Sequence, residues 1–135
     1  MATRDPMQDT DMSHAIKNCT HCHNVCLETL HYCLNQKKNQ FTGKHIELLQ
    51  MCADACDLAL KMMIADMESH HQSCQLCLEL CTACDDACEA FPNDAEMRRC
   101  AAICRRCAES CRGTAGLHRT ISADAQDQKP RGTAR

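Results

Sequence analysis

Apolar residues and cysteines recur every three or four positions along most of the chain, from Met12 to Cys111. The densest stretch, residues 74–88, has cysteines in steps of three, four, three and four, which is the a/d spacing of two heptads. That spacing places all of these side chains on one face of an α-helix. The stretches 12–33, 45–63 and 97–111 have the same kind of spacing. The pattern therefore predicts four amphipathic helices, over about 11–36, 44–65, 70–90 and 94–112, with cysteines on their inner faces.

Turn-forming residues separate these stretches. Residues 37–43 combine two charges, an asparagine and a glycine, residues 66–69 offer capping side chains, and residues 91–94 read Phe-Pro-Asn-Asp. We expect Gly113 to end the last helix. Such short connections favour an all-α, antiparallel up-down-up-down four-helix bundle with a cysteine-lined core over residues 11–113. Residues 1–10 are expected to form a flexible arm and residues 114–135 a disordered tail, because neither has apolar periodicity.

The composition changes what the core must be made of. Only 19 of the 135 residues are Leu, Ile, Val or Phe, whereas 15 are cysteine, so cysteine must fill much of the interior. The net charge is −3, and the chain has one Tyr, two Phe and no Trp, which argues against a nucleic-acid partner. No secretory signal or apolar run long enough to span a membrane is visible. We therefore expect a soluble, cytoplasmic protein.

In a reducing cytosol, dense cysteine indicates metal or redox chemistry rather than disulfides, and an odd count excludes complete pairing within one chain. Thiolates three or four residues apart on a helix are close enough to bind one ion from two sides, which suits the soft monovalent ion Cu(I). With two unshared cysteines per ion the chain would hold roughly seven ions, and sulfur bridging would raise that number. The candidate ligands are Cys19, Cys22, Cys26, Cys33, Cys52, Cys56, Cys74, Cys77, Cys81, Cys84, Cys88, Cys100, Cys104, Cys107 and Cys111.

Three other functions remain open at this stage. An iron-sulfur or thiol redox carrier would also use Cys-x-x-Cys spacings, although iron-sulfur ligands usually lie on loops. A zinc buffer would need tetrahedral groups of four ligands. The third alternative is a structural interaction bundle in which the cysteines only pack, as single buried cysteines usually do. A store without catalytic turnover fits the pattern best, because every cysteine lies on a predicted core stripe.

Three other side chains are candidate access or peripheral ligands. His45 lies on the core stripe one turn into the second predicted helix, and His70 lies on the stripe of the third helix just before Cys74. Met63 lies at the opposite end of the predicted bundle from His45. The remaining histidines, including His71, are expected to be solvated or to flank the core.

The chain resembles the cytosolic bacterial branch of the Cys-rich four-helix-bundle copper storage proteins. The resemblance rests on the cysteine motifs that begin at Cys19, Cys52, Cys74 and Cys100, and it covers about residues 14–112. It implies a bundle that binds many Cu(I) ions through all fifteen cysteines, assembles as a homotetramer and serves cytosolic copper storage and detoxification. A copper chaperone or a small-molecule thiol is a candidate copper donor.

Two positions depart from the family pattern. Thr29 and His45 stand where the fullest members have cysteine, which implies a lower capacity. Family members tend to have histidines at one mouth of the bundle, near the turn between the third and fourth helices. This chain has none in that turn, and His45 is the histidine expected at the same end.

Overall fold

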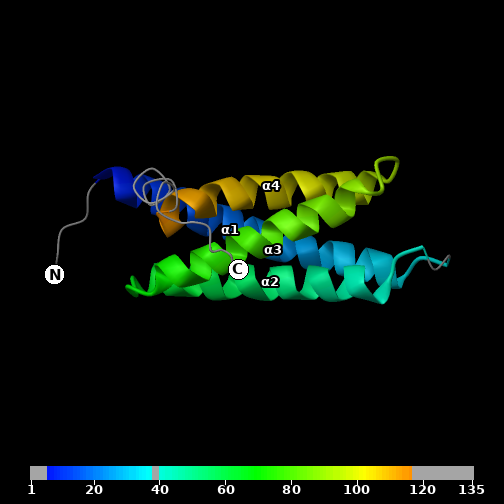
Figure 1. Ribbon diagram of the computed structural model, residues 1–135, viewed down its shortest axis with the longest axis horizontal. Helices are drawn as coiled ribbons and strands as arrows, with labels where there is room; N and C mark the ends of the chain where they lie inside the picture. The colour runs from blue at the N-terminus through cyan, green and yellow to red at the C-terminus, as the bar shows by residue number, and fades with distance from the viewer. Residues whose placement is uncertain (1–5, 38–39, 117–135) are drawn as a thin grey trace, which may run out of the picture.

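The part of the chain described by the computed structural model, residues 6–37 and 40–116, is an all-α bundle of four helices (Figure 1). They are α1 (Pro6–Leu34), α2 (Gly43–Ile64), α3 (His70–Glu89) and α4 (Ala95–Ala115). Helices α1 and α3 each pack against both α2 and α4, and short turns connect successive helices. The predicted antiparallel up-down-up-down bundle is confirmed.

The two outer boundaries of the bundle differ from the prediction. Helix α1 begins at Pro6 rather than near residue 11, because proline fits the first turn of a helix, where no backbone N–H bond is needed. Helix α4 continues through Gly113 and ends at Gly116, whose φ of 75° gives the left-handed C-cap expected for Gly113. The bundle therefore includes a few residues that the sequence assigns to the arm and to the tail. The rest of both, residues 1–5 and 117–135, lies outside the described residues.

The turn between α2 and α3 is the tight break that the sequence predicts. Asp66 adopts a left-handed conformation with φ of 57°, which asparagine and aspartate tolerate better than most residues. The backbone N–H of His70 then donates to the carbonyl of Met67 at 3.0 Å. Ser69 is the N-cap of α3 but makes no side-chain capping bond. The turn reverses the chain within five residues and begins α3 at a histidine.

The core consists of the predicted stripe. All fifteen cysteines are buried and none is in a disulfide. Small alanines such as Ala15, Ala53 and Ala59 are fully buried between the helices, which allows the backbones to approach closely. Leu49, Met63 and Met97 are among the few large side chains that are fully buried. Cysteine thus takes the place that leucine has in an ordinary bundle.

The outer surface is charged, and its ion pairs lie on exposed faces. Arg105 of α4 binds Asp85 at 3.1 Å and also Glu89, both on α3, and Arg99 binds Glu28 of α1 at 2.8 Å. Exposed pairs of this kind contribute little to stability. No helix in the described residues has both the length and the hydropathy of a membrane-spanning segment.

Candidate metal centre

Most of the buried thiols form groups of four. Within each of five groups, all four Sγ atoms lie within 4.8 Å of one another. Ordered by shared members, the quartets are Cys19/Cys77/Cys107/Cys111, Cys56/Cys77/Cys81/Cys107, Cys22/Cys52/Cys56/Cys81, Cys22/Cys26/Cys52/Cys104 and Cys26/Cys84/Cys100/Cys104. Each quartet shares two cysteines with the next. The thiols therefore form one continuous ladder along the bundle rather than separate sites.

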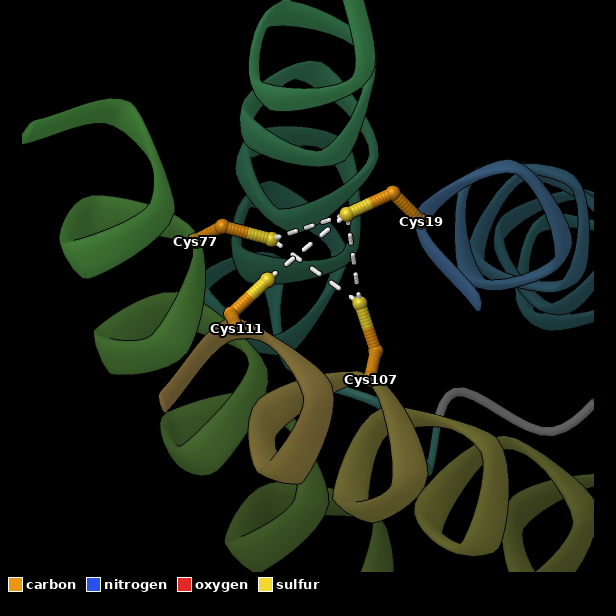
Figure 2. Close-up of side chains that lie close together, drawn as sticks. All are labelled: Cys19, Cys77, Cys107 and Cys111. Atoms are coloured by element: carbon orange, nitrogen blue, oxygen red, sulfur yellow. Dashed lines mark hydrogen bonds between the residues drawn. The ribbon is translucent and has the colours of Figure 1, made fainter. Parts of the chain in front are cut away.

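Figure 2 shows the first of these quartets. Cys19 comes from α1, Cys77 from α3, and Cys107 and Cys111 from successive turns of α4, and the four side chains point toward a common centre. The Sγ atom of Cys19 lies 3.6 Å from that of Cys111, 3.7 Å from that of Cys107 and 3.9 Å from that of Cys77. Three helices thus supply four soft ligands to one small, fully buried volume.

The separation of the sulfur atoms fits more than one metal. A tetrahedral zinc site with Zn–S bonds of about 2.3 Å has sulfur atoms about 3.8 Å apart. Cys81 Sγ lies 3.6 Å from Cys52 Sγ and 3.9 Å from Cys22 Sγ, so these thiols match that geometry as well. Distance alone therefore does not separate Zn(II) from Cu(I).

Charge distinguishes the two metals. A divalent ion held by four unshared thiolates leaves two negative charges in the core, and no Lys or Arg is buried among the described residues to balance them. Cu(I) needs only two thiolates, and a thiolate can bridge two ions. The number of monovalent ions can then approach the number of thiolates, which brings the net charge of the core toward zero. The long shared ladder thus favours Cu(I).

Burial favours the protonated form of the thiols, because it penalises the charged thiolate. Burial raises the pKa of Cys33 to about 11. Contact with Cys107 and other neighbouring thiols, together with burial, raises the pKa of Cys56 far above its ordinary value. Because the thiolate is the form that binds metal, each bound ion must displace protons from the core.

Three cysteines, Cys33, Cys74 and Cys88, lie outside the quartets and extend the ladder at its two ends. Cys74 interacts with the thiol of Cys111 and thus adjoins the first quartet. Cys88 interacts with Cys100 and Cys84 of the last quartet. Every predicted cysteine ligand is thus in the core, and its assignment as a copper ligand stays a prediction.

One end of the bundle, which we call the His45 end, carries the α1–α2 and α3–α4 turns. His45 Nε2 lies 3.7 Å from the Sγ atom of Cys88, so the imidazole continues the ladder where the prediction placed it. Burial lowers the pKa of His45, which keeps the ring neutral and able to bind a metal. The rings of Phe41 and Phe91 lie 5.9 and 5.7 Å from the His45 ring. His45 is only 6% exposed beneath them.

Thr29 occupies a rung between the last quartet and the His45 end. It lies one helical turn from Cys26 and one from Cys33, and its side chain is fully buried. Its Oγ1 is the only buried side-chain nitrogen or oxygen in the described residues without a hydrogen-bond partner. The predicted interruption of the thiol ladder is therefore an unsatisfied hydroxyl group.

The opposite end, which we call the His70 end, carries the α2–α3 turn and the last turn of α4. His70 is 7% exposed, and Met63 and Met12 are buried. The role of His70 and Met63 as ligands stays a prediction. The sequence predicts that His71 is solvated or flanks the core. His71 is exposed, but its Nδ1 lies 2.9 Å from the carbonyl oxygen of Thr114 on α4, and its ring lies 4.2 Å from that of His70.

Comparison with known proteins agrees with this geometry. A family model described as copper storage protein matches residues 8–116. A crystal structure of the Nmul_A1745 protein from Nitrosospira multiformis is 32% identical, covers 81% of this chain and 98% of its own, and superposes with a TM-score of 0.74. The structure of Cu(I)-bound copper storage protein BsCsp3 is 31% identical, covers 78% of this chain and 98% of its own, and also has a TM-score of 0.74.

A curated relative is the uncharacterized cysteine-rich protein YhjQ of Bacillus subtilis (strain 168). It is 34% identical over 66 residues, which are 49% of this chain and 61% of that protein. The family match, by contrast, extends over all four helices and every cysteine of the ladder. The chain belongs to the copper storage protein family.

Proposed function

We propose that this protein stores Cu(I) in the cytosol, binds several ions per chain and protects the cell from free copper without catalysing a reaction. The observation that carries the proposal is the overlap of the five quartets, because shared thiols allow sulfur to bridge adjacent ions. A scaffold for single ions would not need such overlap. The family membership supports the same cargo.

The residues of the chain have distinct tasks in such a store. The thiols of the ladder exchange protons for Cu(I), since burial favours the protonated thiol in its absence. The packing of the four helices fixes the positions of the sulfur atoms. The closely packed core also keeps water and oxidants from the metal, which favours the monovalent state.

A homotetramer is part of the proposal. Several large apolar side chains remain about half exposed on the single chain, and an interface between copies would cover them. They are Leu34, Met51, Leu58, Ile64, Met67 and Leu76. A copper chaperone or a small-molecule thiol is the proposed donor, since either one delivers Cu(I) already bound to sulfur.

An anaerobic titration with Cu(I) against a chromophoric chelator tests the storage proposal. We expect roughly seven or more equivalents to bind tightly to each chain. Replacing Cys77, Cys81, Cys84 and Cys88 by serine should remove several equivalents while the helix content by circular dichroism stays nearly unchanged, because serine is close to cysteine in size. One or two equivalents for the natural chain, or an unchanged capacity for the variant, would contradict storage in the ladder.

A further inference from the structure

We propose that His70 and His71 are two successive Cu(I) ligands through which ions enter and leave the ladder at the His70 end. The inference rests on the proposed storage function and adds a port to it. Four observations support the site: the hydrogen bonds of the two rings, their spacing, their contrast in exposure and their connection to the thiols.

The hydrogen bonds fix which nitrogen of each ring is available. His70 Nδ1 lies 2.7 Å from the carbonyl oxygen of Met67, and His71 Nδ1 lies 2.9 Å from the carbonyl oxygen of Thr114. A carbonyl oxygen only accepts hydrogen bonds, so Nδ1 carries the proton and donates it in both rings. The imidazole tautomer that makes this bond has its lone pair on Nε2. This is the arrangement that orients metal-binding histidines, in which a backbone carbonyl holds the other nitrogen.

The two rings bridge solvent and core. Their centroids are 4.2 Å apart and their planes differ by 33°. His71 is exposed, whereas His70 is 7% exposed. Rings this close and this nearly parallel do not hold one ion between them in linear coordination, so each imidazole offers one Nε2 ligand in turn, and imidazole nitrogen suits copper. An ion captured by His71 at the surface thus reaches a buried ligand in one step.

The path from His70 into the ladder is continuous. Cys74 lies one helical turn after His70 on the same buried face of α3. Its thiol interacts with that of Cys111, whose Sγ lies 3.6 Å from that of Cys19 in the first quartet. Imidazole binds Cu(I) without losing a proton, and the Cys74 thiol loses its proton to solvent when it takes over the ion. The path therefore leads from two successive imidazole nitrogens to thiolates.

In the part of the chain that the structure describes, the buried histidine of the His45 end has no exposed histidine beside it. His45 and Phe41 are each 6% exposed, and the Phe41 and Phe91 rings pack edge-to-face at 4.9 Å. The aromatic side chains cover the last ligand instead of leading to it. We infer that His45 terminates the ladder and that ions pass through the His70 end.

The test compares loading rates of His70→Asn, His71→Asn and the double variant with the natural chain. The Asn amide keeps a donor near the position of Nδ1 but lacks Nε2, so the carbonyl bonds can survive while the proposed ligand is lost. His31→Asn, at an exposed histidine of α1 near the His45 end, is the matched control. Cu(I) is supplied anaerobically as its complex with a chromophoric chelator, and loss of the complex is followed by stopped flow.

We expect His71→Asn and the double variant to load about tenfold more slowly, with the final number of ions unchanged, and His31→Asn to load at the natural rate. One equivalent of Ag(I), a redox-inert substitute, should shift the Nε2 resonances of both rings in nitrogen NMR spectra. Natural loading rates in all three port variants, or no shift at either ring, would overturn the port. A low capacity of the natural chain would instead contradict storage, and the NMR result would still decide whether the two rings bind metal.

Discussion

The two ends of the bundle both place a histidine on the cysteine stripe but surround it differently. At the His45 end, the ring lies against Cys88 and beneath Phe41 and Phe91. At the His70 end, the ring lies beside an exposed second histidine, and backbone carbonyls orient both. A buried histidine at the end of the ladder can thus be covered from solvent or be connected to it through a second ligand. The residues contributed by the turns and helix ends decide which of the two results.

The largest expected effect comes from opening the covered end. Phe41→Ala removes a buried ring that packs on Tyr32, His45 and Phe91, and it should lower the free energy of unfolding by about 3 to 5 kcal/mol. Urea denaturation measures this loss. If the aromatic cover is what closes the His45 end, the same change should restore part of the loading rate to the His70→Asn/His71→Asn variant. Leu78→Ala, at a buried position away from both ends, controls for general loosening of the bundle.

A change in pH should affect the ladder and the port differently. Burial favours the protonated thiols, so an ion that binds two of them as thiolates displaces two protons, and its affinity should fall about 100-fold for each unit by which the pH is lowered. An ion held by an imidazole of the port displaces no thiol proton. Chelator competition at pH 7.5 and 6.5 should therefore show a steep loss for the full complement of ions, whereas the Ag(I)-induced shift at His70 and His71 should change less. Equal pH dependence would contradict the assignment of neutral ligands to the port.

Without metal, alkaline pH should destabilise the protein. The pKa of Cys33 rises from 9.0 to about 11 on folding. The protonated thiol is thus the form that the fold favours, so its contribution to stability is complete below about pH 9 and is lost as the pH rises through 11. Thermal unfolding of metal-free protein between pH 8 and 11 measures the loss, and Cys33→Ser should reduce it.

The smallest effect concerns Thr29, close to the covered end. Thr29→Val keeps the shape of the side chain and removes a buried hydroxyl without a partner, so metal-free protein should gain about 1 kcal/mol or more. Thr29→Ser, which keeps the hydroxyl, should not show this gain. Thr29→Cys should instead add a rung and raise the copper capacity. A loss of stability in Thr29→Val would indicate that the hydroxyl has a partner in solution.

The fold and the ladder could be predicted because the cysteine spacing follows the helical period closely. Each step of three or four between Cys74 and Cys88 returns the side chain to the same face, so burial of one thiol implies burial of the others. The boundaries were less predictable. Pro6 and Gly113 are each compatible with more than one helical position. Thr114 is buried and Ala115 packs against the core, so α4 continues past Gly113.

The difference between the two ends was not predictable from periodicity. The covered end depends on Phe41 and Phe91, which come from two turns far apart in the sequence, and the port depends on a bond between His71 and Thr114. Neither contact follows from the spacing along one helix. The adjacent histidines were a usable signal, since a pair that begins a helix beside a cysteine stripe has one ring facing inward and the other facing outward.

The sharing of cysteines between successive quartets affects the order in which ions are bound and released. Independent sites would exchange ions with the solvent in parallel. A row of overlapping sites with one port would instead release first the ion that was bound last. Two copper isotopes supplied in succession would distinguish these behaviours, because a single-file store would release the second isotope ahead of the first. The protein would then keep its oldest ions deepest and make its newest ones most readily available to the cell.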